Sequence, residues 1–556
     1  MASLSGALRR ENGAASLAWG EDCRFQAAGD AQAAVLGPAR RELPAEALAL
    51  AARPGDAEAI LRAHLLAGMG FSFAVWEGGR LTLGADPWGL QTLYYREADA
   101  GVRFSDRLAD LARPGEEKLH LASCEHYMRY FTVPPGRTLL GGVRRVCPGE
   151  RLVVSAEGIT AEPFIVLGGE RLQDPIEARW QLRESVEEAV AAAADLPPGE
   201  AVGLLLSGGA DSTALLALLR QVRGSGPIVA IHAGDEGSPD RDFARAVAAR
   251  HAAKFVDLTL TGRDAWESLV WIVGSMEAPG GNASAVASCR AFSQAREMGL
   301  RRVISGLGAD EAFGGHGKHL LAPWWPWMGR LPLSLRKPLA RWGRTPALRA
   351  ALAAEGGPAE MHRAMYCLME EETADRLRGG LARFAQPRPE GGPGHPPDYS
   401  SALLQVDLDQ WLRAALAPMA GALAAANGLE LALPLASVPL LRLSAAMPLS
   451  WKVRGRSGKH IFRQALEDLL PAEIRVRSRK GFTVPSSEWL RGGLGETARQ
   501  LLDPGRVERW CLLDKEGPGR LLQDHMAGRA DWGLVLWGWM TFSEWHDRFF
   551  PPKGGM

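Results

Sequence analysis

The chain has 556 residues, 46% of them hydrophobic and 23% charged, which is typical of a globular protein long enough for two or more domains. Its 64 basic and 64 acidic side chains balance to zero formal charge, which argues against a dedicated nucleic-acid-binding protein. None of the six cysteines is spaced for a CxxC zinc or redox motif. With no signal-like apolar core and no apolar run of about 18 residues, we expect a cytoplasmic protein with neither a membrane nor a nucleic-acid partner.

The first part of the chain carries short runs of alternating apolar residues. FSFAVWEGG (71–79) and RLTLGAD (80–86) meet at a Gly-Gly turn, which predicts a β-hairpin. LQTLYYRE and GVRFSD repeat the alternation. We therefore predict an α+β domain of antiparallel sheets over residues 1–168.

Residues 169–556 have a different pattern. A helix is predicted to begin at Pro175. Four short apolar strands, which alternate with helices, follow at 201–206, 227–234, 254–260 and 301–306. This alternation predicts a doubly wound parallel α/β domain with a mostly helical C-terminal part. Residues 386–397, rich in Pro and Gly, predict a surface loop. WGLVLWGWMTF, near the end, predicts a buried helix.

The segment SGGADS (207–212) lies between a predicted strand and a helix. Gly208 and Gly209 allow the backbone to turn so that several N–H groups converge, and the helix adds its positive end. The hydroxyls of Ser207 and Ser212 complete a seat for pyrophosphate. Asp211 would repel phosphate unless a cation lay between them, which indicates Mg²⁺. An ordinary strand-to-helix turn is the alternative, and the GK[ST] ending of a Walker A loop is missing.

A second loop, SGLGADE (305–311), also follows an apolar strand. Because the carboxyl ends of parallel strands meet at one edge of a sheet, we expect Asp310 to face Asp211 across one site. Two carboxylates suit Mg²⁺ ions that bridge phosphate oxygens.

A third segment, from GKH (458–460) to RKGF (479–482), ends in a basic stretch. Lys480 could stabilise negative charge that develops on an acyl-adenylate. Taken alone, this stretch is better interpreted as a solvated basic loop.

Together, SGGADS, SGLGADEAFGG and KHIFRQALEDLLPAEIRVRSRKGF resemble motifs of the asparagine synthetase superfamily, and the N-terminal segment GFSFAVWEGGRLTLGADPWGLQTLYY resembles its N-terminal domain. The resemblance covers nearly the whole chain. It implies an Ntn-hydrolase-like, glutamine amidotransferase-type sandwich followed by a PP-loop (adenine nucleotide alpha hydrolase-like) synthetase domain. It also implies an ATP-dependent carbon–nitrogen ligase that uses ATP and Mg²⁺, forms AMP and passes through an acyl-adenylate.

The resemblance assigns roles to residues at the matching positions. Those expected to bind the nucleotide and Mg²⁺ are Leu205 and Ile231 at the adenine, Ser207, Gly208, Gly209, Asp211 and Ser212 at pyrophosphate and Mg²⁺, Ser305 and Gly306 at the nucleotide, and Asp310 as a second Mg²⁺ ligand. Lys480 matches the lysine that stabilises adenylate formation or amine attack.

Several positions depart from the family pattern. Glutamine-using members carry a cysteine nucleophile at position 2, where this chain has Ala2, and its first cysteine is Cys23. Asp56 resembles a relic of the glutamine site, so the N-terminal domain is expected to be silent for glutamine. Leu307 stands where asparagine synthetases have a glutamate and β-lactam synthetases a tyrosine. Ser437 replaces an acid, and no general base is identified.

Two offshoots of the family lack glutaminase activity: β-lactam synthetases and the cyclases that make lasso peptides. Leu307 lacks the phenol of the former, and the Trp- and Arg-rich segment 322–344 suits a peptide, although a packed helical hairpin explains it equally well. We therefore predict a lasso peptide cyclase that activates a side-chain carboxylate of a precursor peptide and closes a ring on the N-terminal amine. A leader peptidase and a leader-recognition protein are the partners implied by analogy. The alternatives are a β-lactam synthetase, an ammonia-dependent asparagine synthetase, a tRNA-modifying relative or a non-catalytic scaffold.

Overall fold

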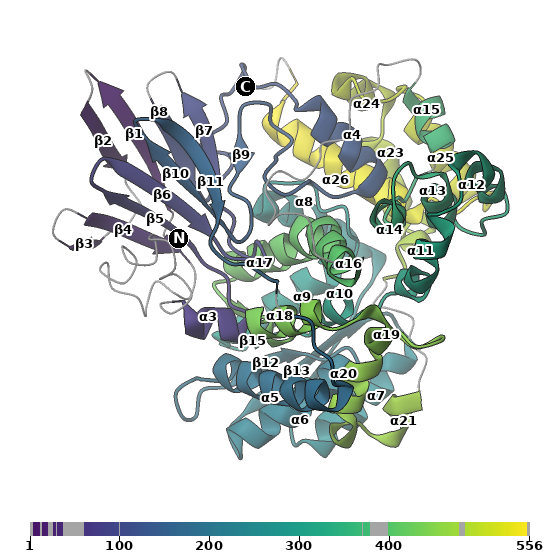
Figure 1. Ribbon diagram of the computed structural model, residues 1–556. Helices are drawn as coiled ribbons and strands as arrows, with labels where there is room; N and C mark the ends of the chain where they lie inside the picture. The colour runs from purple at the N-terminus through teal and green to yellow at the C-terminus, as the bar shows by residue number, and fades with distance from the viewer. Residues whose placement is uncertain are drawn as a thin grey trace.

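The computed structural model describes residues 4–11, 14–20, 26–28, 31–36, 61–98, 101–168, 170–369, 371–378, 399–476 and 484–552. Antiparallel sheets near the N-terminus are followed by a parallel sheet and many helices (Figure 1), so the expected mixed α/β class is confirmed. Among these residues no helix is long and apolar enough to cross a membrane. The boundary between residues 168 and 169 stays a prediction.

Antiparallel pairing builds two sheets from the N-terminal strands. The first has the order β2-β1-β8-β7-β9, with β1 at Ser5–Glu11, β2 at Ala14–Trp19, β7 at Tyr94–Ala98, β8 at Gly101–Ser105 and β9 at Arg144–Arg145. The second has the order β11-β10-β6-β5-β4-β3, with β3 at Gln26–Ala28, β4 at Ala31–Leu36, β5 at Ser72–Glu77, β6 at Arg80–Ala85, β10 at Glu150–Ser155 and β11 at Gly158–Pro163. Helices α3 (Arg62–Ala67) and α4 (Leu121–Tyr130) belong to the same part of the chain.

The two sheets form a sandwich because alternate residues of their strands point toward one another. Leu8 and Phe104 from the first sheet share a buried cluster with Leu83 and Val154 from the second. The predicted hairpin is present: β5 pairs with β6 from Ser72↔Ala85 to Glu77↔Arg80. Its turn residues Gly78 and Gly79 have φ values of 55° and 77°, a conformation that favours glycine.

The parallel sheet has the order β14-β13-β12-β15-β16. Its strands are β12 (Val202–Leu205), β13 (Ile228–Gly234), β14 (Lys254–Thr259), β15 (Arg302–Ile304) and β16 (Glu430–Ala432). The connecting helices are α5 (Pro175–Ala193), α6 (Ala210–Arg223), α7 (Pro239–Arg250), α8 (Gly262–Met276), α9 (Ala285–Glu297) and α10 (Ala309–Phe313). The four predicted strands are present. The sequence did not reveal β16, because a three-residue strand is too short for a periodic pattern.

The rest of the chain is mainly helical, as predicted. Its helices are α11 (Trp325–Met328), α12 (Leu333–Ala340), α13 (Pro346–Ala353), α14 (Pro358–Ala364), α15 (Glu371–Arg378), α16 (Tyr399–Asp407), α17 (Ala417–Ala426), α18 (Val438–Ala446), α19 (Leu449–Lys452), α20 (His460–Ala465), α21 (Ala472–Val476), α22 (Ser486–Arg491), α23 (Leu494–Leu501), α24 (Pro504–Trp510), α25 (Gly517–Met526) and α26 (Gly533–Phe549). A π-helical stretch, Leu408–Leu416, joins α16 to α17. The predicted buried helix is α26, in which Trp537, Trp539 and Trp545 are fully buried. The predicted loop at 386–397 lies outside the described residues.

A turn after β6 connects the sandwich to the part of the chain that contains the parallel sheet. The carboxylate of Asp86 accepts hydrogen bonds from the backbone N–H groups of residues 71 and 88–91. Burial raises its pKa to about 6, against the lowering effect of those N–H groups. The turn positions Trp88, whose Nε1 donates to the carbonyl of Ala436 at 2.6 Å. Arg413 Nε donates to the carbonyl of Pro87 at 2.8 Å, so the same turn is held from a second side.

Trp88→Phe should lower the thermal unfolding midpoint, because phenylalanine retains the buried ring but leaves the carbonyl of Ala436 without its donor. The expected cost is about 1–3 kcal/mol, the usual penalty for an unsatisfied buried acceptor. Near-UV circular dichroism measures the midpoint. Trp180, which is 69% exposed, provides the matched control as Trp180→Phe, and equal midpoints for the two variants would contradict this role of Trp88.

Candidate active site

The loop between β12 and α6 is arranged as a phosphate seat. Gly208 has a φ of 74°, and a Cβ at this position would lie 2.5 Å from the carbonyl oxygen of Asp240, so only glycine fits. Ser212 Oγ lies 3.1 Å from Ser207 Oγ and accepts from the Ser207 N–H at 3.2 Å. Gly209 then caps α6, and the free N–H groups of the first helical turn face the same hollow.

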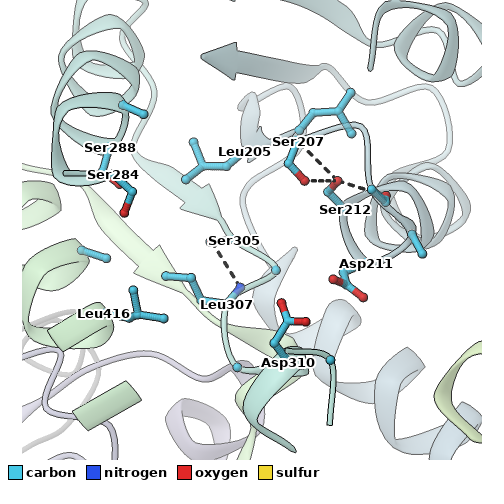
Figure 2. A pocket seen from close by; sticks show the side chains of 18 of the residues that line it. Leu205, Ser207, Asp211, Ser212, Ser284, Ser288, Ser305, Leu307, Asp310 and Leu416 are labelled. Atoms are coloured by element: carbon cyan, nitrogen blue, oxygen red, sulfur yellow. Dashed lines mark hydrogen bonds between the residues drawn. The ribbon is translucent and has the colours of Figure 1, made fainter. Parts of the chain in front are cut away.

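The second loop lies directly beside the first because β12 and β15 are hydrogen-bonded neighbours. A Cβ on Gly306 would contact the Cβ of Asp211 at 3.5 Å. Gly308 has a φ of 95°, and a Cβ there would lie 2.4 Å from the Cβ of Ala436. Figure 2 shows Asp211 and Asp310 pointing toward one another across the hollow. The expected convergence of the two loops is therefore observed.

A lysine bridges the two carboxylates. Lys459 Nζ lies 2.7 Å from Asp211 Oδ2 and 2.8 Å from Asp310 Oδ1. The side chain of Lys459 is 6% exposed. Burial acts to lower its pKa, but the two neighbouring carboxylates outweigh this and raise the pKa overall. The backbone reinforces the position, because the Lys459 N–H donates to the carbonyl of Phe313 at the end of α10.

These groups line one cavity of about 520 Å³. Its wall includes all the described residues that the sequence predicted for the nucleotide and cation: Leu205, Ser207, Gly208, Gly209, Asp211, Ser212, Ile231, Ser305, Gly306 and Asp310. Leu307 also lines it, and Leu307 and Leu416 lie on the side away from Ser207 and Ser212 (Figure 2). The cavity therefore combines a polar end, formed by the two loops, with an opposite wall that carries the apolar Leu307 and Leu416 beside the hydroxyls of Ser284 and Ser288 (Figure 2).

The donor set fits a divalent cation. Asp211 Oδ1 is buried without a hydrogen-bond partner, while its other oxygen contacts Lys459. An orphaned buried carboxylate oxygen is costly unless a cation or donor satisfies it. Because carboxylate oxygens are the ligands that Mg²⁺ prefers, Asp211 together with Asp310 could hold this ion next to a phosphate chain.

Other residues that the sequence singled out lie outside the described residues or outside the cavity wall. Lys480 lies outside the described residues, as do Ala2, Cys23 and Asp56. Ser437 is fully buried and is not part of the cavity wall. In the segment 322–344, Trp325 is buried in a small cluster with α13 and α14, whereas Trp324, Trp327 and Trp342 are exposed. The segment is therefore packed in part, and its use for a peptide stays a prediction.

Among the cavity residues to which the sequence assigned no role are the titratable side chains Lys459, Glu311 and His316. Lys459 belongs to the third segment, but a lysine after a glycine carries no signal of its own. Glu311 and His316 flank the recognised Phe-Gly-Gly turn. Their side chains pair at 2.9 Å between His316 Nε2 and Glu311 Oε1, which only the fold of the turn reveals.

The family model and the curated relatives agree on one family. The family model described as "Asparagine synthase" matches residues 181–547. A putative glutamine-hydrolyzing asparagine synthetase of Mycobacterium tuberculosis (strain ATCC 25618 / H37Rv) is 29% identical, over 92% of this chain and 82% of its own length. Asparagine synthetase [glutamine-hydrolyzing] 1 of Bacillus subtilis is 24% identical, over 87% and 78% respectively. Among solved structures, the glutamine phosphoribosylpyrophosphate amidotransferase of B. subtilis matches with a TM-score of 0.18, 11% identity and coverage of 46% and 74%, too weak a likeness for any argument.

Gly208→Ala should distort the phosphate seat and weaken nucleotide binding, because the new methyl group would collide with the carbonyl of Asp240. Strain of about 1–3 kcal/mol at one residue corresponds to about 5- to 150-fold weaker nucleotide binding, measured by isothermal titration calorimetry with ATP. Gly79→Ala is the matched control, since Gly79 has a similar φ of 77° but nothing within 4 Å of a new Cβ. Equal ATP affinity of both variants would overturn the assignment.

Proposed function

Since this chain belongs to the asparagine synthase family and is an ATP-dependent carbon–nitrogen ligase that forms AMP, we propose that it closes a macrolactam ring in a precursor peptide. The ring joins a side-chain carboxylate of Asp or Glu to the N-terminal amine of the same peptide, as in lasso peptide cyclases. Glutamine hydrolysis takes no part. In this proposal the N-terminal sandwich is a degenerate Ntn-type glutaminase domain, and the parallel α/β part is a PP-loop synthetase domain.

The nucleotide is proposed to lie along the cavity. Leu205 and Ile231 contact the adenine, and the loop 207–212 receives the pyrophosphate end. Asp211 and Asp310 hold Mg²⁺, which offsets phosphate charge when it is bound. Support comes from the positions of these side chains around one hollow and from the unpartnered oxygen of Asp211. Lys480, outside the described residues, is proposed to stabilise the adenylate.

The reaction has two steps. An oxygen of the peptide carboxylate attacks the α-phosphorus of ATP, a P–O bond to the β-phosphate breaks, and pyrophosphate leaves. The amine nitrogen then attacks the acyl carbon, the C–O bond to AMP breaks, and the nitrogen loses a proton. Binding the amine and the acyl group of one molecule together replaces a bimolecular encounter, and such proximity accounts for a large part of the expected rate.

The observation that carries the proposal is the apolar side chain at position 307 of the cavity wall. Leu307 lies in the second loop and lines the cavity with Leu416, so position 307 supplies neither a carboxylate for an ammonium ion nor a phenol for a small β-amino acid. The exposed Trp324, Trp327 and Trp342 add aromatic surface that suits a peptide. A leader peptidase and a leader-recognition protein are the proposed partners.

The alternatives differ in the substrate that triggers pyrophosphate release from ATP and Mg²⁺. A linear core peptide that loses one water during the reaction supports the cyclase. Release with a small β-amino acid supports a β-lactam synthetase-like enzyme, and release with aspartate and ammonium supports an ammonia-dependent asparagine synthetase. Wild-type release without any peptide dependence would overturn the cyclase proposal.

Asp211→Asn should reduce peptide-dependent pyrophosphate release by about 100-fold or more, since it removes the negative charge that holds the cation next to the phosphates. A coupled phosphate assay measures the rate. Asp524→Asn is the control, because Asp524 lies on α25 and pairs with Arg529. Wild-type rates for Asp211→Asn would contradict the role of Asp211 as a cation ligand that catalysis needs.

Lys459→Met should also reduce peptide-dependent pyrophosphate release, but for a different reason. Without the ammonium, Asp211 and Asp310 repel one another in a partly buried site, so the loops should separate until a cation replaces it. We expect a loss of about 100-fold at limiting Mg²⁺, partly recovered as Mg²⁺ is raised, in the same assay. Lys515→Met, at a surface ion pair with Glu508, controls for loss of a lysine. An unchanged Mg²⁺ dependence would contradict this role of Lys459.

A further inference from the structure

We propose that His316 is the general base that takes the proton from the attacking amine, and that Glu311 holds its imidazole in place. The proposal rests on the proposed function only in that an amine attacks an acyl-adenylate, and it does not depend on which amine. It addresses the step for which Leu307 provides no acid or base.

The two side chains form a hydrogen-bonded pair in the cavity wall. Glu311 lies on α10 with a side chain only 1% exposed, and His316, 27% exposed, follows the Phe-Gly-Gly turn. His316 Nε2 lies 2.9 Å from Glu311 Oε1. A buried carboxylate next to Nε2 favours the tautomer with its proton on Nε2, which leaves Nδ1 as the acceptor. The carboxylate also stabilises the imidazolium that forms when Nδ1 takes a proton, as in other carboxylate–histidine pairs.

The pair lies at the phosphate end of the cavity. Gly315, directly before His316, packs against the cation-binding groups so tightly that a Cβ there would lie 1.8 Å from Asp310 Oδ1 and 2.2 Å from Lys459 Cε. Both His316 and Glu311 line the cavity together with these residues. An acyl group on the α-phosphate must lie near this end, so an amine that reaches the acyl carbon also comes within reach of His316.

His319 holds His316 in position. The backbone N–H of His316 donates to His319 Nδ1 at 2.9 Å, and the two imidazole rings stack with centroids 5.4 Å apart. Since His319 Nδ1 accepts this bond, its proton is on Nε2, which donates to Asp407 at 2.7 Å. Asp407 also accepts from His362 Nε2 at 2.9 Å. The Nε2 atoms of His319 and His362 both donate to the carboxylate of Asp407. We assign these three residues the role of positioning His316.

In the proposed step the amine nitrogen forms its bond to the acyl carbon and the bond from that carbon to the AMP oxygen breaks. The proton leaves the nitrogen for His316 Nδ1, and AMP departs with the electron pair of the broken bond. The imidazolium then releases its proton to solvent, which reaches the partly exposed ring. No oxidant, reductant or further reactant is required.

The surrounding charges determine the pH range in which this base works. Burial acts to lower the pKa of His316, but the hydrogen bond and charge of Glu311 outweigh it, Asp310 adds to the increase, and Lys318 opposes it, so the pKa is raised above its usual 6.5. The neighbouring His319 is neutral, since burial lowers its pKa to about 4. A base must be unprotonated to act, so amide formation should increase as pH rises through a value above 6.5.

The test separates the two half-reactions of His316→Gln. Adenylation is followed by carboxylate-dependent exchange of labelled pyrophosphate into ATP, and acyl transfer by mass spectrometry of the amide. The probe is whichever pair wild-type enzyme turns over: a linear core peptide, aspartate with ammonium, or a small β-amino acid. We expect exchange within about 3-fold of wild type and amide formation reduced about 100- to 10,000-fold, the usual contribution of a general base. The defect should shrink at high pH, where the amine is already unprotonated.

Hydroxylamine provides a readout that a merely structural role would not give. It is largely unprotonated at neutral pH and attacks adenylates without a base, so hydroxamate formation by His316→Gln should match that of wild type. Glu311→Gln should retain a hydrogen bond to His316 but move the rising limb of the pH profile to lower pH. His251→Gln, at a partly exposed histidine after α7, is the control.

Wild-type amide formation by His316→Gln, or a parallel loss of exchange, hydroxamate and amide, would overturn the assignment of the base. These outcomes concern only the comparison of variants. A failure of the cyclase proposal would appear separately, as wild-type turnover of a small substrate in place of the peptide.

Discussion

The site depends on the pairing of β12 with β15. These strands are neighbours in a parallel sheet, so the loops that follow them leave the sheet at the same edge. Glycines at positions 208 and 308 then allow the loop backbones to approach other chain segments more closely than any side chain would permit. This arrangement places Asp211 opposite Asp310 and so brings two negative charges to one site. The other features of the cavity compensate for that charge.

Lys459 compensates for this negative charge directly. Two carboxylates at one partly buried site repel one another, and removing either from water is unfavourable unless it is paired. The ammonium contacts one oxygen of each acid, which leaves Asp211 Oδ1 available. The protein therefore keeps the site assembled before a nucleotide arrives, yet retains a ligand oxygen for a cation. Such preorganisation reduces the reorganisation that the reaction itself would require.

The N-terminal sandwich contributes to the same site through packing. Trp88 donates its indole proton to the carbonyl of Ala436, and the methyl group of Ala436 occupies the space that a side chain at position 308 would need. The N-terminal part of the chain thus supports the loop that carries Asp310, and its loss would leave that loop without support from one side.

Sequence reasoning identified the two glycine-rich loops because strand, turn and helix signals flank each of them and because the chemistry of their side chains is distinctive. It could not identify the pairing of His316 with Glu311, since four residues that include the Phe-Gly-Gly turn lie between them and neither residue type is informative alone. It likewise missed β16, whose three residues form a strand only because β15 provides a hydrogen-bonding edge. Isolated histidines and lysines are common on protein surfaces, so their positions gain meaning only through their neighbours.

The sequence by itself determined the antiparallel and parallel halves of the fold, the strand-to-helix loops, and the presence of Asp211 and Asp310 at one edge, because these follow from local periodicity and from the geometry of parallel strands. Only the tertiary structure decided which cation stands between the acids, which histidine faces the cavity, and how the Trp88 turn supports Gly308. These contacts join residues far apart in the chain: Lys459 lies 248 positions from Asp211 and Trp88 lies 348 from Ala436. Packing selects such partners by shape and charge in three dimensions, which no local pattern records.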